Sequence, residues 1–571
     1  MITSDIQEIN IADLNEYQGD CTLLLTENQK GYWRKLKLEP NKSVTGISYP
    51  FSYEYDEINS TTNVDGSYNN RVSHESEYID TFYDFSSGIP TWGLQTSDST
   101  TFRWSPQVVG NEGSEPAITC DLKGNAFLIF KNISGDILVR RYNGDSKLWE
   151  TQVTLDNTST EPKIEMGESG IAIASWTKNT GNSRVIAASY YDVATQTWSS
   201  PTVLSVSPAI YDLESHASIN DTGNGVVTWT SPDSGGFNSN IQVANFNVTT
   251  KSWVTLPGNL SPGEIGVSYF DSRVGIDNSG NVIAIWTQSK NTSLSNIQSV
   301  TYDSATSTWS TTIFDLSNLE ENASSPDLSV NNNGDAMAIW IDRNSSSGGH
   351  VLKGRKYDGN TKTWSSITHS IASVNNYTYQ PKISMNNLGT AIVIWENNDF
   401  KIESSIYDPI EDSWSNPILI STVKLPSGFH KPDLSMNDFG DAVATWLDAN
   451  SSSQTIMESS TYIGVAKKWS EIDIISTSEV YSYSSNQVVL KGNRAVTIWV
   501  INNGVDPTQI VGAPGIINPN IMTANDSKVS FAFRKVQEVG EPELDTDAAT
   551  KFYVDNAIAG LNQLFMKTLK N

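Results

Sequence analysis

The sequence contains little that would support disulfide, metal or nucleic-acid chemistry. Only two cysteines, Cys21 and Cys120, occur in 571 residues, and they are far apart, which excludes a disulfide framework and a cysteine-rich metal site. Lysine and arginine number 37 against 64 acidic residues, so the net charge of −27 argues against binding to nucleic acid. Cys120 falls at an apolar strand position that recurs along the chain, and we expect it to be a small core residue.

Long apolar runs and catalytic motifs are also missing. No apolar stretch reaches the roughly 18 residues of a membrane-spanning helix, and MITSDIQEIN lacks the pattern of a secretory signal. The five histidines show no ligand or triad spacing, and there is no GxSxG, HExxH or phosphate-binding loop. The Asn/Asp/Gly turns match no calcium loop, and most carboxylates lie in predicted turns rather than in pairs typical of glycosidases. We therefore expect no cofactor, no metal, no membrane insertion and no catalysis.

What the sequence does contain is a repeat of about 50 residues. A glycine is followed six residues later by Trp or Phe in seven copies, and an eighth copy is one residue longer. The eight glycines lie 46, 53, 57, 54, 55, 51 and 52 residues apart. In seven copies, Tyr or Phe then precedes a second Trp by seven residues, as in Tyr407 and Trp414. Two coupled landmarks in so many registers indicate a repeat architecture.

Each copy predicts four short antiparallel strands. In PKISMNNLGTAIVIWEN, Ile383 and Met385 alternate with polar residues, NNLG is a hairpin turn, and the next strand is apolar on both faces. A strand buried on both faces lies inside a stack of sheets. The fold class is therefore all-β, a β-propeller of eight blades, with seven as the alternative.

The two ends of the repeat region are complementary. RWSPQVV, around Trp104, resembles a fourth strand without its first three, whereas the Gly492/Trp499 copy has no fourth strand. We expect the N-terminal strand to complete the last blade and to close the ring, which would remove its exposed edges. A solenoid, the main rival, would need polar caps at both ends.

The domain boundaries follow from this pattern. Residues 1–40 predict a small β module, with an apolar strand at 22–25 and a basic RKLKL strand, and residues 41–100 an extended connector. We expect the propeller to occupy residues 101–515. A linker with a short strand should follow at 516–544, and a helix should end the chain at 545–571. In that helix Val554, Ile558, Leu561 and Phe565 are spaced as a coiled-coil seam, which favours self-association over docking on its own chain.

Both termini resemble parts of bacteriophage virion proteins. The segment ELDTDAATKFYVDNAIAGLNQLF is similar to a motif of tail-fibre proteins, and residues 1–40 resemble the small N-terminal modules of fibre proteins. The resemblance implies a virion structural protein, assembled in the host cytoplasm. It also implies a homotrimer whose partners are other virion proteins or a host-surface glycan or protein. A non-viral bacterial carbohydrate-binding adhesin and a glycan-degrading enzyme remain the alternatives, because fold alone does not assign function.

Overall fold

In the computed structural model, the chain forms two compact units, residues 101–517 and residues 1–100 with 518–571. Side chains are described for 104–517, apart from residue 111 and the segments 206–213, 233–237, 291–293, 320–321, 344–348, 375–380, 398, 422–431, 449–455, 465–466, 477–485, 502–507 and 516–517. The predicted seam of Val554, Ile558, Leu561 and Phe565, with the helix that would carry it, lies outside the described residues. Among those described, no helix is long and apolar enough to span a membrane.

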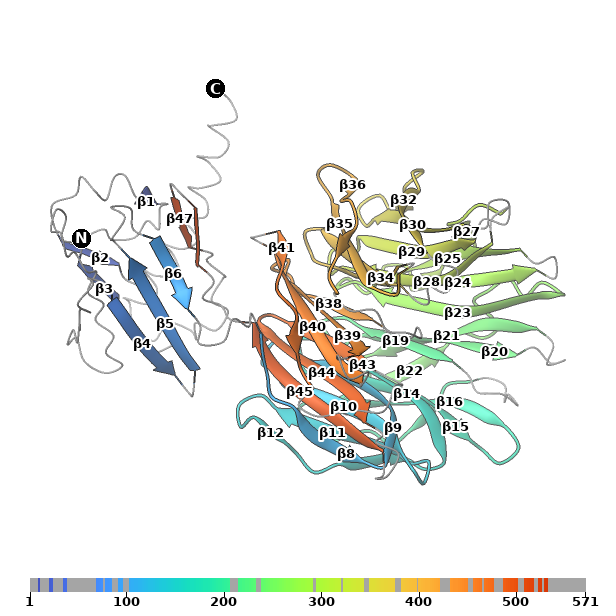
Figure 1. The fold of residues 1–571 in the computed structure, drawn as a ribbon. Helices are drawn as coiled ribbons and strands as arrows, with labels where there is room; N and C mark the ends of the chain where they lie inside the picture. The colour runs from blue at the N-terminus through green and yellow to red at the C-terminus, as the bar shows by residue number, and fades with distance from the viewer. Residues whose placement is uncertain are drawn as a thin grey trace. The chain divides into compact units, whose positions relative to one another are not determined.

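The unit 101–517 is an eight-bladed β-propeller of antiparallel sheets (Figure 1). Blade 1 begins with β9, and blade 8 begins with β43. The first, innermost strands are β9 (Gly113–Cys120), β14 (Ser159–Met166), β19 (Ser215–Ile219), β23 (Val267–Ile276), β28 (Ala323–Val330), β33 (Lys382–Met385), β38 (Asp433–Met436) and β43 (Asn486–Lys491).

The second and third strands form the middle of each blade. The second strands are β10 (Ala126–Asn132), β15 (Ala172–Asn179), β20 (Gly225–Pro232), β24 (Val282–Lys290), β29 (Ala336–Arg343), β34 (Ala391–Glu396), β39 (Ala442–Ala449) and β44 (Arg494–Ile501). The third strands are β11 (Ile137–Asn143), β16 (Arg184–Asp192), β21 (Ser239–Asn247), β25 (Ser295–Asp303), β30 (His350–Asp358), β35 (Ile402–Asp408), β40 (Thr455–Ile463) and β45 (Gln509–Ile517).

The fourth strand is divided into two short pieces in most blades. The first pieces are β12 (Leu148–Trp149), β17 (Thr197–Trp198), β26 (Thr308–Trp309), β31 (Thr363–Trp364), β36 (Ser413–Trp414) and β41 (Lys468–Trp469). The second pieces are β13 (Val153–Asp156), β18 (Thr202–Val203), β27 (Phe314–Asp315), β32 (His369–Val374), β37 (Ile418–Leu419) and β42 (Asp473–Ile474), and blade 3 has β22 (Ser252–Thr255). A serine after the Trp explains the break in blade 6, because the hydroxyl of Ser415 accepts the Ile406 N–H at 3.0 Å in place of a ladder bond.

The ring closes as the sequence predicts. The strands β7 (Phe102–Trp104) and β8 (Gln107–Asn111) pair antiparallel with β45 and supply the outer strand of blade 8. In Figure 1 the orange β45 lies beside the blue N-terminal strands of the propeller. The indole N–H of Trp104 donates to Ser459 in blade 7 at 3.1 Å. The prediction of eight blades with a composite last blade is therefore confirmed.

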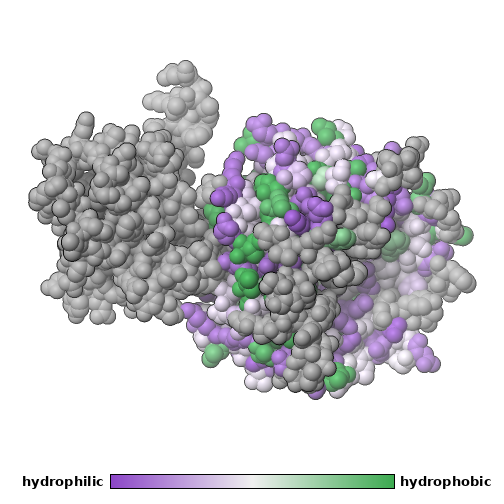
Figure 2. Space-filling model, in the orientation of Figure 1, coloured by the Kyte–Doolittle hydropathy of each residue, from purple (hydrophilic) through white to green (hydrophobic). Residues whose placement is uncertain are grey.

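The core consists of layers between blades. Eight clusters of buried side chains each join two consecutive blades, including blades 8 and 1. The repeated Trp of the second strand is buried in seven blades, with Phe130 in the eighth, and the repeated glycine has positive φ in every copy, from +57° to +96°. Cys120 is fully buried, as expected of a core residue. On the face in view in Figure 2, apolar side chains form separate areas among polar ones.

The strands described in the other unit form three small sheets. A hairpin pairs β2 (Asp20–Leu23) with β3 (Arg34–Lys37), and β4 (Tyr68–His74), β5 (Glu77–Asp84) and β6 (Thr91–Gln95) form an antiparallel sheet. The third sheet joins β1 (Ile9–Asn10) to β47 (Lys528–Phe531) and β46 (Met522–Asn525), so segments from the two ends of the chain pair. The sheet of β4, β5 and β6 lies in the segment for which the sequence predicts a connector.

Closure by β8 can be tested with two adjacent valines. Val109 is 1% exposed within the cluster between blades 8 and 1, whereas Val108 on the same strand is 52% exposed. Changing Val109→Asp places a charge in an apolar layer, and we expect it to lower the free energy of unfolding by about 3–5 kcal/mol. Val108→Asp is the matched control and should change it by less than about 0.5 kcal/mol. Equal thermal unfolding of the two variants would show that this strand does not close the ring.

Candidate functional site

The innermost strands surround the axis of the ring, where a propeller has its central channel. Along β33 and β38, partly exposed side chains alternate with buried ones, as in Lys382 and Ile383. Since successive side chains of a strand point to opposite faces, the set that includes Ile118 packs against the preceding blade, and the set that includes Thr119 lies toward the next blade beside the axis. The sequence shows this alternation but not which polar residues it brings together.

Two rings of side chains follow from this register. Each inner strand contributes one residue to the charged ring, three positions before the last apolar residue of the strand. These residues are Ala117, Lys163, His216, Arg273, Asp327, Lys382, Asp433 and Gln487. The small ring lies two residues later and comprises Thr119, Glu165, Ser218, Gly275, Ser329, Ser384, Ser435 and Val489. No sequence motif marks these residues, because their nearest partners lie one repeat or more away.

Ring residues hold consecutive blades together. The free edge of an inner strand has backbone N–H groups without a strand partner, and the preceding blade supplies side-chain acceptors for them. Seven such bonds have N···O distances of 2.8–3.1 Å, from Ile118 to Gln487, Met166 to Thr119, Ile383 to Asp327, Met385 to Ser329, Met436 to Ser384, Val488 to Asp433 and Leu490 to Ser435. The polar lining is therefore part of the structure of the ring.

A β-bulge adds carboxylates at the start of several inner strands. Glu115, Glu161 and Asp271 have positive φ values of 52°, 54° and 57°, and the strand register shifts there. The carboxylate of Glu115 accepts the Glu161 N–H at 2.6 Å and the Thr160 hydroxyl at 2.9 Å, and it pairs with Lys131. Bulges redirect side chains in this way, and this one joins blade 1 to blade 2.

Three blades share an ionic cluster at the charged ring. The guanidinium of Arg273 lies 3.0 Å from Asp271 and 3.6 Å from Asp327, and it donates to Nε2 of His216 at 2.9 Å. Burial, together with the charge of Arg273, lowers the pKa of His216 to about 3. His216 is therefore neutral at neutral pH and serves as an acceptor for Arg273.

Two lysines of the charged ring have no such partner. The ammonium groups of Lys163 and Lys382 form no hydrogen bond or ion pair with the residues that the structure describes. Glu214 and Glu161 near Lys163, and Asp433 near Lys382, act on them through charge. Burial lowers the pKa of Lys163; Glu214 and Glu161 oppose this shift, while Arg273 and Lys382 act with it. Charged side chains therefore lie near these ammonium groups, but no described residue accepts a hydrogen bond from them.

Glu165 is the one acidic residue of the small ring. Its side chain remains solvent-exposed, yet the surrounding protein raises its pKa to about 7, with Lys491 opposing the shift. This combination is expected of a carboxyl group that projects into a narrow aqueous channel. Below neutral pH, Glu165 is largely protonated and can donate a hydrogen bond.

Hydrogen bonds join the turns that follow the inner strands of blades 3, 4 and 5. One carboxylate oxygen of Asp221, in blade 3, accepts the side-chain amides of Asn278 at 2.8 Å and Asn332 at 2.7 Å. Because Asn332 belongs to blade 5, these turns reach across two blade interfaces.

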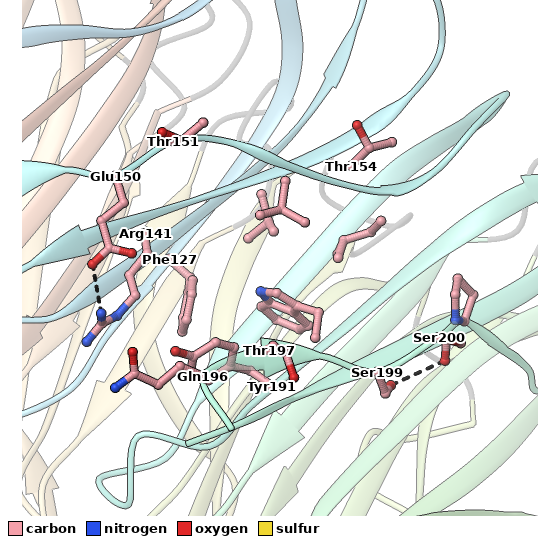
Figure 3. Close-up of a pocket in the computed structure, with 15 residues that line it drawn as sticks. Phe127, Arg141, Glu150, Thr151, Thr154, Tyr191, Gln196, Thr197, Ser199 and Ser200 are labelled. Atoms are coloured by element: carbon pink, nitrogen blue, oxygen red, sulfur yellow. Dashed lines mark hydrogen bonds and ion pairs between the residues drawn. The ribbon is translucent and has the colours of Figure 1, made fainter. Parts of the chain in front are cut away.

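A pocket of about 440 Å³ lies between the outer strands of blades 1 and 2 (Figure 3). Phe127 and Tyr191 face each other there with ring centroids 4.6 Å apart, and Arg141 donates to Glu150 at 2.8 Å at one end. The Tyr191/Trp198 pair recurs as a Tyr or Phe with Trp in seven blades, at 5.0–5.6 Å. The walls of this pocket are thus ordinary blade packing, and the axial channel is the stronger candidate.

Comparisons with known proteins bear on the fold alone. No family model matches the sequence, and no curated protein matches it. Similar solved structures include the Dos1 propeller, 9% identical over 73% of this chain and 94% of that chain, with a TM-score of 0.44. The WD40 domain of SCAP from fission yeast is 9% identical over 73% of this chain and 95% of that chain, with a TM-score of 0.43. The polysaccharide lyase Uly1 is 9% identical over 69% of this chain and 88% of that chain, with a TM-score of 0.42. Such distant similarity assigns no ligand or activity.

No metal centre accompanies the channel in the part of the chain that the structure describes, where no group of three or more His, Cys, Asp or Glu could hold an ion. Polar groups do converge on the axis, which the sequence could not indicate. The only site residues that the sequence predicted, the C-terminal seam, lie beyond the described residues.

The channel makes stability depend on pH. In an unfolded chain Asp titrates near about 4, whereas burial raises the pKa of Asp433 to about 6. The folded protein therefore holds more protons between about pH 4 and 6, and this group makes the free energy of unfolding fall as the pH rises through that window. His216 has the opposite effect below about pH 6.5, its usual pKa.

Changing Asp433→Asn should remove one part of this dependence, about 1–3 kcal/mol between pH 5 and pH 8. The amide oxygen can still accept the Val488 N–H, so the fold should persist. Thermal unfolding at the two pH values measures the effect, with Asp145→Asn, at an exposed turn, as the control. A variant whose melting temperature drops between pH 5 and pH 8 as far as that of the wild type would contradict the assignment.

Proposed function

We propose that the protein is a structural and attachment protein of a bacteriophage particle, whose propeller binds a glycan of the host surface at the axial channel. The observation that carries the binding role is the channel lining, where the ammonium groups of Lys163 and Lys382 have no acceptor among the described residues. A ligand rich in hydroxyl and acidic oxygens supplies what these donors lack. Concave sites with a few convergent polar groups are typical of ligand binding.

The virion assignment rests on the termini. The DAATKFYVD motif and the N-terminal module resemble parts of tail-fibre proteins. The proposed seam of Val554, Ile558, Leu561 and Phe565 would join three copies, because one short helix cannot bury such a stripe alone. Three weakly binding propellers on one particle would gain avidity. A non-viral bacterial adhesin would use the same channel without a particle.

We propose further that binding is not accompanied by catalysis. Glycoside hydrolysis commonly uses two carboxyl groups that face the scissile bond, and Asp327 and Asp433 each accept a backbone N–H of the next blade at 3.0 and 2.8 Å. One observation favours the alternative of a glycan-degrading enzyme. Glu165, with its pKa near 7, would suit a general acid. Turnover of a host polysaccharide that is lost in Glu165→Gln would establish that alternative.

The full chain should bind cells of the bacterium that the encoding phage infects, and antibodies against it should label purified particles. Changing both Ile558→Asp and Leu561→Asp places charges in the seam. We expect light scattering to show a trimer for the wild type and a monomer with a folded propeller for this variant. Cell binding should weaken at least tenfold because avidity is lost.

Two results would overturn parts of this proposal. If the antibodies do not label purified particles but the protein still binds bacterial cells, the non-viral adhesin is favoured. A wild-type monomer at micromolar concentration would mean that the helix does not join copies, and no binding to host cells by the trimer would end the attachment role.

A further inference from the structure

A hydrogen bond that recurs between outer strands is missing at the pocket between blades 1 and 2. In blades 5, 7 and 8 the indole N–H of the outer Trp donates to a serine on the third strand of the preceding blade. These bonds run from Trp364 to Ser299 at 3.1 Å, from Trp469 to Ser404 at 2.8 Å and from Trp104 to Ser459 at 3.1 Å. The serine is thus the usual acceptor for this indole in a substantial part of the ring.

Blade 1 carries Val139 at the position of that serine, and Val139 packs with Trp198 of blade 2 in one cluster. The indole N–H of Trp198 therefore has no acceptor among the residues that the structure describes. At the next interface Ala188 takes the same position, and the N–H of Trp253 is buried without a partner. Trp198 instead lines the pocket, and its N–H is not buried. This donor is available to a ligand.

Tyr191 supplies a second unpaired donor in the same pocket. It is 6% exposed, and its hydroxyl forms no hydrogen bond with the described residues. Burial raises the pKa of Tyr191, and the nearby charges of Arg141 and Glu150 act on that pKa in opposite directions. Figure 3 shows Phe127, Tyr191 and Arg141 at the same end of the pocket. A polar group left unpaired in so enclosed a place costs free energy unless a ligand or water satisfies it.

The other walls indicate the chemical class of that ligand. Phe127 and Tyr191 lie 4.6 Å apart and Phe127 and Trp198 5.3 Å apart between ring centroids, so one side of the pocket is aromatic. Arg141 and Glu150 form an ion pair at 2.8 Å, which adds donors and an acceptor but no net charge. The volume of about 440 Å³ lies within the range of small-molecule sites.

We infer that this pocket binds a neutral sugar ring. The apolar C–H groups of the ring would pack against the aromatic side chains, and its hydroxyl groups, which both donate and accept, would bind Trp198, Tyr191 and the Arg141–Glu150 pair. A charged ligand fits less well because the ion pair is already neutral. The site lies outside the axial channel, and the inference does not depend on binding there or on a virion role.

Saturation-transfer NMR titration of the full chain tests the site with the methyl glycosides of D-glucose, D-galactose, D-mannose and L-rhamnose. We expect at least one glycoside to bind at millimolar concentration. Glycerol, which has hydroxyl groups but no ring, should bind at least tenfold more weakly, and D-glucuronate no better than the best glycoside. Binding of no glycoside, equal binding of glycerol, or tighter binding of D-glucuronate would each overturn the inference.

Restoring the missing acceptor locates the sugar. In Val139→Ser the new hydroxyl should accept the Trp198 N–H, as Ser299 does for Trp364, and weaken binding of the best glycoside at least fivefold. Ala188→Ser places the same hydroxyl at the next interface, beside Trp253, and should bind like the wild type. A folded Val139→Ser variant that binds as tightly as the Ala188→Ser variant would contradict the inference.

A surface variant keeps the test decisive if Val139→Ser does not fold. The side chain of Glu150 is 45% exposed, so Glu150→Ala should leave the propeller folded and weaken binding at least fivefold. Glu471→Ala, at an exposed position between the outer strand pieces of blade 7, is the matched control and should bind like the wild type. A sugar held only in the axial channel would bind Glu150→Ala unchanged, which would refute the pocket and leave the proposed attachment site standing.

Discussion

The hydrogen bond between a ring side chain and the backbone N–H of the next inner strand is the interaction on which the rest of this propeller depends. Every inner strand has one edge without a strand partner, and an unpaired N–H at a buried edge costs about 1–3 kcal/mol. Thr119, Ser329 and Ser435 each satisfy such a group in the following blade. The bond also fixes the position of each blade relative to its neighbour around the axis.

This constraint explains why the axis is polar. Positions that must accept a neighbour's N–H require oxygen-bearing side chains, so Ser, Thr, Asp and Gln recur in the two rings. Where blades 2 and 6 carry lysine instead, the side chain cannot accept, and its ammonium remains available. The candidate site therefore consists of lysines at positions where other blades carry side chains that accept a backbone N–H of the next blade. Functional sites in proteins commonly retain such locally unfavourable groups.

The sequence predicted the fold well because the fold is repetitive. The six-residue spacing between Gly389 and Trp395 is repeated in most other copies, and the unpaired fourth strand at Trp104 predicted the closure of the ring. The axial site was not predictable in this way. Lys163 and Lys382 look like ordinary polar positions of an alternating strand, and only the closed ring brings them to a common axis. The division of the fourth strand was missed because a serine hydroxyl replaces a backbone bond there, as at Ser415.

The most direct test of this account is hydrogen exchange at the inner-strand edges of the native protein. The amides of Met166, Met385 and Leu490 have no strand partner on the axial side and donate instead to Thr119, Ser329 and Ser435. We predict that they exchange as slowly as amides within the blade ladders, and that Ser435→Ala accelerates exchange at Leu490 alone. Rapid exchange of all three amides in the wild type would contradict the claim that these bonds hold the ring together.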